Sequence, residues 1–175
     1  MSEELHHECG VAALYWLDKP LGKGGRASES VINGDVAGLV PTMLLDLQNR
    51  GQLAAGMSSY NPAHTQILDT YKAIGTVSEA FRVSHPDRYR EILTRYAGIA
   101  AIGHTRYATC GADDVRYAQP FERHHGRMWK WFTFAFNGNL ANYTELRDRL
   151  LTKRNYYFTL NTDTEILMHA LAVHQ

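Results

Sequence analysis

The sequence predicts an α+β fold, because strand-like and helical patterns alternate along the chain. Residues 10–17 form a nearly continuous apolar run, and residues 98–104 form a second run of small and apolar residues. Apolar residues repeat at helical spacing between residues 36 and 47, and a helical pattern with its own start signal covers residues 163–174. Short apolar runs are typical of buried strands, whereas the repeating pattern is typical of helices with one buried face.

Length and composition fit a single domain with no general affinity for polyanions. The 175 residues are 45% hydrophobic, which is enough to fill one core. Eighteen Lys and Arg balance eighteen Asp and Glu, so no overall field favours nucleic acid or an anionic membrane. No apolar run approaches the length of a membrane span, and residues 1–8 lack the apolar core of a secretory signal. We expect a soluble, cytoplasmic protein that binds neither nucleic acid nor membranes.

The N-terminal third is predicted to supply a strand, a helix and a second strand. Residues 10–17 read as a central strand covered on both faces, since their apolar character is nearly continuous. The helix within residues 36–47 contains Pro41, which a helix accepts only in its first turn. Small residues and glycines at 48–56 allow close backbone approach, and a strand follows over residues 57–60.

The middle of the chain is predicted to continue with alternating elements. A strand is expected at residues 66–71, helices at 77–82 and 88–96, and a strand at 98–104. Residues 112–127 read as a loop.

The C-terminal part is predicted to hold an aromatic strand and two capped helices. The strand covers residues 129–136 and ends in the turn dipeptide Asn137-Gly138. Two capping patterns then start helices that run to about Leu151 and over residues 163–174: Asn142 with Glu145, and Thr162 with Glu165. The last helical pattern stops at Gln175 without a glycine cap, which favours a truncated chain.

Cys9 is the candidate nucleophile. If the Glu8–Cys9 bond were cut, one residue would carry both a thiol and a free α-amino group. The reference pKa of such an amine is about 7.7 to 8, so part of it is neutral near pH 7 and can accept the thiol proton. The alternative is a buried cysteine in an edge strand. The other cysteine is Cys110, and two cysteines argue against a disulfide framework.

Three further features have both a functional and a structural interpretation. Arg106 follows a strand among small residues, where its guanidinium needs a substrate carboxylate or a structural partner. Asp163 could hold a substrate ammonium or simply favour the positive end of a helix. Asn137 and Gly138 could donate hydrogen bonds to an oxyanion or form a hairpin turn.

Metal, nucleotide and RNA sites are less well supported by the sequence. The pairs His6-His7 and His124-His125 are adjacent rather than at the spacing of zinc ligands. Glycines at 22–25 lack the phosphate-loop patterns, and the aromatic run at 129–136 has few basic neighbours. We therefore expect no metal and no cofactor.

Taken together, five motifs in this order resemble the class II glutamine amidotransferases. They run through essentially the whole chain: Cys9-Gly10-Val11, Arg50-Gly51-Gln52 with Ala54-Ala55-Gly56, Gly103-His104-Thr105-Arg106-Tyr107-Ala108-Thr109, Asn137-Gly138-Asn139-Leu140 and Thr162-Asp163-Thr164-Glu165. The resemblance implies the fold of N-terminal nucleophile hydrolases, a four-layer αββα sandwich with two sheets between helical layers. The sequence departs from the family at Leu53, Phe136 and Cys110.

The resemblance also implies a role for each matched residue. Cys9 would be the nucleophile, freed by autocatalytic removal of the leader 1–8 from a domain that covers residues 9–175. Asn137 and Gly138 would form the oxyanion hole, and Arg106 and Asp163 would bind the α-carboxylate and α-amino groups of glutamine. Tyr107 and Thr109 would line the glutamine pocket.

The expected activity is a glutaminase reaction that supplies ammonia to an acceptor. The acceptor would be a synthase domain beyond Gln175 or a separate subunit, in a protein that is a homo-oligomer when complete. Two motifs, at 50–52 and 137–140, are similar to those of amidophosphoribosyltransferases of purine synthesis, whereas 105–109 is closer to glucosamine-6-phosphate synthases. Two rival interpretations are a self-processing hydrolase of another amide and a non-catalytic binding or scaffold domain.

Overall fold

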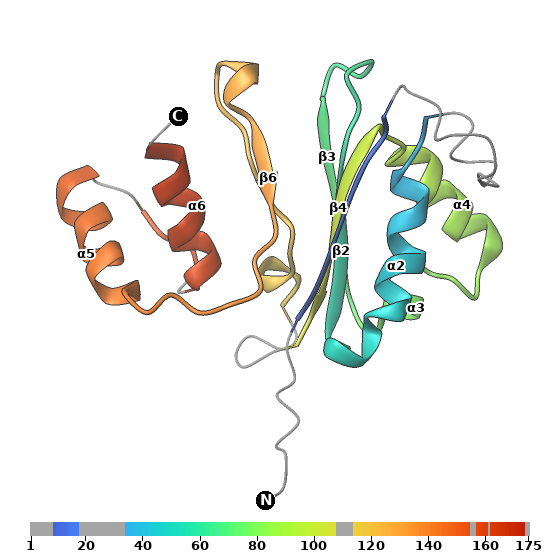
Figure 1. The fold of residues 1–175 in the computed structure, drawn as a ribbon, viewed down its shortest axis with the longest axis horizontal. Helices are drawn as coiled ribbons and strands as arrows, with labels where there is room; N and C mark the ends of the chain where they lie inside the picture. The colour runs from blue at the N-terminus through green and yellow to red at the C-terminus, as the bar shows by residue number, and fades with distance from the viewer. Residues whose placement is uncertain (1–8, 18–33, 108–113, 155–156, 161, 174–175) are drawn as a thin grey trace, which may run out of the picture.

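The computed structural model describes residues 9–17, 34–107, 114–154, 157–160 and 162–173. Its elements stack in four layers, with helices outside and two β-sheets inside (Figure 1). One sheet has four antiparallel strands and the other has two. The α+β class and the αββα order of layers are confirmed.

The larger sheet brings the start of the chain beside its middle. Its strands follow the order β1-β4-β2-β3, with β1 (Gly10–Tyr15), β4 (Ala100–Arg106), β2 (Ala54–Tyr60) and β3 (Leu68–Ile74). The β1–β4 register pairs Gly10 with Thr105. Because these strands are antiparallel, the residue before β1 lies beside the residues that end β4.

The prediction that residues 10–17 form a central strand is wrong. Within the part of the chain that the structure describes, β1 is an edge strand. Ala12 is buried beneath the helices, whereas Val11, Ala13 and Tyr15 on the opposite face are exposed. An apolar run reports the character of both faces of a strand, but it does not report whether both are covered.

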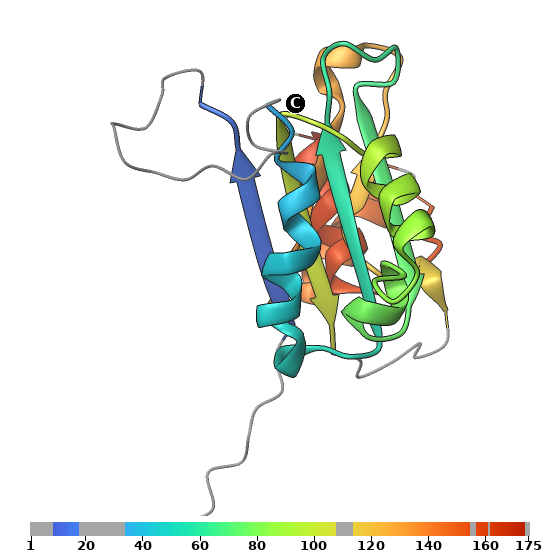
Figure 2. The same cartoon turned by 90° about the vertical axis from the view of Figure 1, so that its right-hand side faces the viewer.

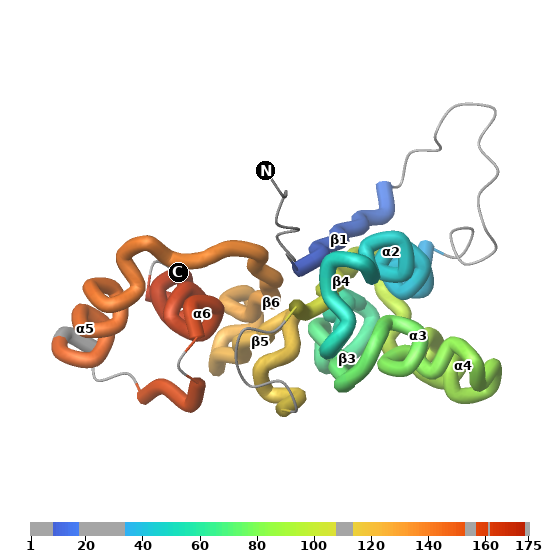
Figure 3. Tube along the Cα trace, turned by 90° about the horizontal axis from the view of Figure 1, so that it is seen from below, coloured from blue at the N-terminus to red at the C-terminus, as the bar shows by residue number. Residues whose placement is uncertain are grey.

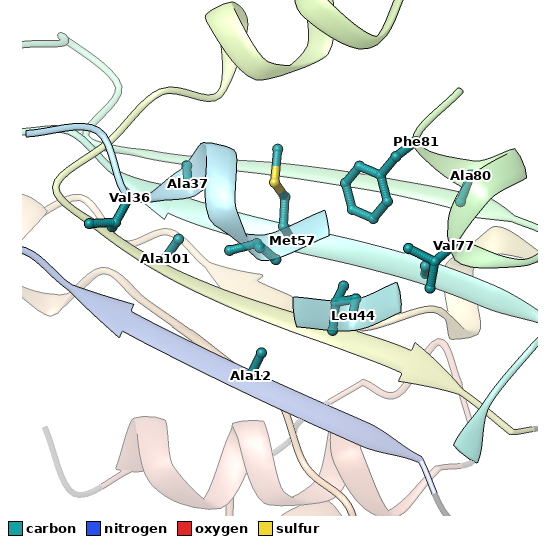
Figure 4. Packing of buried hydrophobic residues seen from close by; sticks show 11 residues of the cluster. Ala12, Val36, Ala37, Leu44, Met57, Val77, Ala80, Phe81 and Ala101 are labelled. Atoms are coloured by element: carbon teal, nitrogen blue, oxygen red, sulfur yellow. The ribbon is translucent and has the colours of Figure 1, made fainter. Parts of the chain in front are cut away.

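Helices α2 (Val40–Asp46), α3 (Val77–Ala80) and α4 (Pro86–Arg95) lie on one side of this sheet (Figure 2). A short 3-10 turn, η1 (Ala37–Leu39), leads into α2, and Pro41 lies in the first turn of α2, as predicted. The core between these helices and the sheet includes Leu44, Met57, Val77 and Phe81 (Figure 4).

The smaller sheet begins the other half of the sandwich. Its strands β5 (Phe121–Arg123) and β6 (Phe132–Phe134) pair antiparallel, and helices α5 (Tyr143–Arg154) and α6 (Asp163–Val173) form the outer layer beyond them. Two short 3-10 turns accompany these strands: η3 (Val115–Tyr117) before β5 and η4 (Met128–Lys130) before β6.

Two predictions in this half need correction. The predicted loop at 112–127 contains the strand β5, and the predicted strand at 129–136 shortens to β6 because η4 takes its first residues. Strands of three residues are too short to show a period in the sequence.

Polar side chains join the two sheets. Thr133 Oγ1 lies 2.8 Å from Ser58 Oγ, and Ser58 Oγ lies against Thr70 Oγ1. The Thr70 hydroxyl in turn donates a hydrogen bond to Glu122 Oε2 at 2.5 Å.

Among the residues described, none of the helices combines the length and the apolar character that crossing a membrane requires.

Candidate active site

Cys9 lies directly before β1, with its free thiol beside the end of β4. Its Sγ accepts a hydrogen bond from the Tyr107 backbone N–H at 3.4 Å and lies 3.6 Å from the Tyr107 carbonyl oxygen. The next residue is also fixed, because the Gly10 N–H donates to the buried Thr105 Oγ1 at 3.0 Å. A Cβ on Gly10 would lie 2.7 Å from that oxygen, so glycine permits this contact.

Arg106 is a buried cation that directly precedes Tyr107, the residue whose backbone contacts the Cys9 thiol. It is the last residue of β4 and is 7% exposed. Its guanidinium carbon lies 5.4 Å from the centre of the Tyr117 ring, a cation–π distance. Strand residues alternate between faces, and Gly103 faces α2, so Arg106 points to the side of the second sheet.

The backbone around Arg106 is held by the segment whose small residues predicted close packing. The Leu53 N–H donates to the Arg106 carbonyl oxygen at 3.1 Å. A Cβ on Gly51 would lie 2.6 Å from the Arg106 carbonyl carbon. The predicted close approach of backbones at 48–56 is therefore confirmed, and what it approaches is the end of β4.

Asn137 and Gly138 follow β6 and are exposed. The alternative of a hairpin turn is wrong, because helix α5 rather than a paired strand comes next. Gly138 is also absent from the described residues with positive φ, which the central positions of a type I′ turn require. A Cβ on Gly138 would lie 2.9 Å from the Phe136 ring, so this glycine allows the chain to fold over Phe136.

Asp163 is the first residue of α6 and lies beside the same segment. Its Oδ2 accepts a hydrogen bond from the Leu140 N–H at 2.6 Å. The carboxylate therefore connects the start of α6 to the chain that follows Asn137 and Gly138.

The predicted site residues fall into two groups that lie toward one end of the sandwich. The start of β1, the end of β4 and the chain after β6 are together at the lower end of Figure 1, and Figure 3 shows them near one another from below. Cys9, Arg106 and Tyr107 form one group, and Asn137, Gly138 and Asp163 the other. Thr109 lies outside the described residues, as do the leader 1–8 and Cys110.

Sequence reasoning missed Gln119, a buried side chain that lies between elements of this region. Its Oε1 accepts a hydrogen bond from the Phe136 N–H at 2.7 Å. Its Nε2 donates to the Phe136 carbonyl oxygen at 3.1 Å and to Thr164 Oγ1 at 3.3 Å. The sequence offers one signal, a polar residue between Ala118 and Pro120 at the start of a strand too short to recognise.

His104 is the second residue that the sequence did not single out as functional. It is fully buried on β4, and neither ring nitrogen has a well-formed hydrogen bond within the described residues. Burial lowers the pKa of His104 to about 4, against the opposing effect of the nearby Phe136 backbone and with a further lowering by Arg106. The ring is therefore neutral at physiological pH.

Metal binding finds no support in the described residues, where no group of three or more His, Cys, Asp or Glu side chains could hold an ion.

Comparison with known proteins identifies the family. The family model of the glutamine amidotransferase domain matches residues 57–174. Amidophosphoribosyltransferase 1 of Arabidopsis thaliana is 32% identical over 98% of this chain and 25% of its own length. The amidophosphoribosyltransferase of Methanothermobacter thermautotrophicus is 32% identical over 97% of this chain and 30% of its own length.

Solved structures agree with the sequence matches. A glutamine phosphoribosylpyrophosphate amidotransferase of B. subtilis, in complex with ADP and GMP, has a TM-score of 0.62 and 30% identity, and the match covers 77% of this chain and 26% of that one. A structure described as the allosteric regulatory enzyme of purine biosynthesis has a TM-score of 0.63 and 31% identity over 76% of this chain and 26% of that one. The chain thus spans between a quarter and a third of the length of these relatives. It belongs to the glutamine amidotransferase domain family.

Proposed function

We propose that this chain hydrolyses the side-chain amide of glutamine with Cys9 as an N-terminal nucleophile and passes the ammonia to an acceptor. One observation carries the proposal. The Cys9 thiol lies against the N–H of Tyr107, the residue that follows the buried cation Arg106. Asp163 and the 137–140 segment lie at the same end of the sandwich.

The charges suit a free amino acid with its two charged ends. Arg106 offers a planar fork of N–H donors to the α-carboxylate, and Asp163 offers a carboxylate to the α-ammonium. A hydrolase of some other amide has no need for this pair. A non-catalytic scaffold domain has no need for this pair either.

The reaction needs one nucleophile, one base and two oxyanion donors. Removal of residues 1–8 would free the α-amino group of Cys9, which accepts the thiol proton as sulfur attacks the amide carbon. The Asn137 side chain and the Gly138 N–H would donate hydrogen bonds to the resulting oxyanion. The α-ammonium then returns the proton to the leaving nitrogen, and the C–N bond breaks. Ammonia departs, and a glutamyl thioester remains on Cys9. Water hydrolyses the thioester to glutamate and restores the thiol.

We propose that the acceptor is the phosphoribosyl group of phosphoribosyl pyrophosphate, bound by an amidophosphoribosyltransferase. The relatives described above carry that name, and the motifs at 50–52 and 137–140 resemble theirs. Glucosamine-6-phosphate synthase is the alternative acceptor enzyme, suggested by 105–109 alone. A synthase domain, or a separate subunit, would receive the ammonia.

We propose further that the complete protein is a cytoplasmic homo-oligomer. The zero net charge of the sequence is consistent with that location, although three relatives are named chloroplastic.

Steady-state assays of the complete protein test the proposal. The wild type should convert glutamine to glutamate, and Cys9→Ala should abolish the conversion while it leaves ammonia-dependent synthesis by the acceptor intact. Consumption of phosphoribosyl pyrophosphate with glutamine, but not of a sugar phosphate, would support the proposed acceptor. Glutamine hydrolysis by Cys9→Ala at the wild-type rate would contradict the proposal.

A further inference from the structure

The amide of Gln119 makes three hydrogen bonds to two separate parts of the candidate site. Gln119 is 8% exposed, so water competes little for these bonds. Two of them form a ring with the Phe136 backbone, at 2.7 Å to its N–H and 3.1 Å to its carbonyl oxygen, and the third reaches Thr164 Oγ1 at 3.3 Å. A buried amide with this many partners has a fixed position.

The orientation of this amide follows from its partners. The Phe136 N–H can only donate, so the Gln119 oxygen faces it and the NH₂ group faces the carbonyl and the Thr164 hydroxyl. A flipped amide would set its NH₂ group against the Phe136 N–H and its oxygen against the Phe136 carbonyl oxygen.

Gln119 takes the place of a strand partner that is missing at this point. The β5–β6 register pairs Phe121 with Phe134, and continued by two residues it sets Gln119 opposite Phe136. Pro120 lies between and has no N–H to donate. The side-chain amide therefore satisfies the Phe136 backbone where the ladder has ended.

The backbone of Gln119 is itself fixed against the first sheet. A Cβ on Gly56, in the middle of β2, would lie 2.4 Å from the Gln119 carbonyl oxygen. The absence of a side chain at Gly56 thus lets this residue sit directly on the sheet that carries Arg106.

We propose that Gln119 is a positioning residue that sets both the oxyanion donors and the ammonium-binding carboxylate relative to the sheet that carries the nucleophile. Phe136 immediately precedes Asn137 and Gly138, and Thr164 immediately follows Asp163. One amide thus holds the chain next to each group. This inference rests on the proposed function, because it assigns the parts that Gln119 positions by their roles with glutamine.

Two variants separate the two arms of the amide. Gln119→Met removes all three bonds at similar volume, so kcat for glutamine hydrolysis should fall and KM should rise, with kcat/KM lower by about a hundredfold for a displacement near 1 Å. Thr164→Val removes only the arm to α6. It should raise KM by up to about tenfold, as expected for one hydrogen bond, and leave kcat near the wild-type value.

Thr133→Val is the matched control. Thr133 is a partly buried hydroxyl that links the two sheets through Ser58 and also donates to the Phe121 carbonyl oxygen of its own sheet. These two bonds reach neither the Phe136 backbone nor α6. It should lower the unfolding temperature and leave kcat and KM unchanged.

The outcomes are distinct when the complete protein is assayed and its unfolding is followed by circular dichroism. The inference would be overturned if the Gln119→Met variant has a lower unfolding temperature but keeps the wild-type kcat and KM, as the control does. If Gln119→Met fails to fold, Thr164→Val decides: an unchanged KM overturns the inference and a raised KM supports it. An inactive wild type would instead contradict the proposed function.

Discussion

Arg106 and Asp163 carry opposite charges on two elements that approach the same end of the molecule. Each also has a structural contact, Arg106 with the Tyr117 ring and Asp163 with the Leu140 N–H. A useful substitution must therefore change the proposed contact with glutamine and preserve the local one.

Conservative variants meet that condition. Arg106→Lys keeps the charge and loses the planar fork, and Asp163→Asn keeps an acceptor for the Leu140 N–H and loses the charge. Each should raise the KM for glutamine by about tenfold or more, as expected when a charge-assisted hydrogen bond is lost. Steady-state kinetics of both variants measure this effect, and an unchanged KM in both would show that neither residue binds glutamine.

His104 predicts a pH dependence of stability. Its pKa is about 4 in the folded protein and 6.5 in the unfolded chain, so the unfolded chain binds the proton more readily. The contribution of His104 to the free energy of unfolding is therefore fully present above pH 6.5 and is lost as the pH falls toward 4. The difference between the two pKa values corresponds to roughly 3 kcal/mol.

Denaturant unfolding between about pH 4 and 7 measures this effect in wild type and His104→Gln. The free energy of unfolding should rise less steeply with pH in the variant. Some slope should remain, because burial also lowers the pKa of His169. Parallel curves would mean that His104 does not titrate as its burial requires.

At the residue scale, the sequence supplied the candidate residues but not the distances between them. Cys9 and Arg106 could be chosen by residue type and motif, but their proximity depends on the pairing of β1 with β4, almost a hundred residues apart. Gln119 has an ordinary side chain in a short irregular stretch, and its three bonds depend on where β6 and α6 lie.

Helix α2 packs directly on β4 because position 103 has no side chain. A Cβ on Gly103 would lie 2.4 Å from Val40 Cγ1 and 3.1 Å from Leu44 Cδ1. Both neighbours are fully buried, so they have little room to move.

Gly103→Ala should therefore lower the free energy of unfolding by about 1–3 kcal/mol through overpacking. Gly126→Ala is the control, because nothing lies within 4 Å of the Cβ that it would add. Thermal and denaturant unfolding compare the two variants, and equal stability would show that α2 can shift away from β4 without cost.

At the scale of elements, strong periodic patterns predicted well and short ones did not. The helix with Pro41 in its first turn and the start of α6 agree with the structure, and Thr162 Oγ1 accepts the Glu165 N–H at 3.2 Å as a cap should. The Glu165 carboxylate, however, accepts from the N–H groups of Thr159 and Leu160. The preceding chain folds back over α6, which a local capping pattern does not report.

The whole molecule places the proposed chemistry where two sheets meet. The first sheet supplies the thiol and Arg106, and the chain beyond the second supplies Asp163 and the 137–140 segment. The hydroxyl chain through Thr133 joins the two sheets. Gln119 lies against Gly56 of the first sheet with its backbone, while its amide bonds to Phe136 and Thr164 of the second half. The order of layers followed from the family resemblance, whereas the edge position of β1 did not follow from its apolar run.

The central claim is that Cys9 becomes the first residue and forms a thioester with glutamine. Protein purified from its native source should be mixed with glutamine, quenched in acid within one turnover, digested and analysed by mass spectrometry. The account predicts an N-terminal peptide that begins at Cys9 and carries one glutamyl group, and a Cys9→Ala protein without it. An active protein that retains residues 1–8, or a glutamyl group found on another residue, would contradict the account.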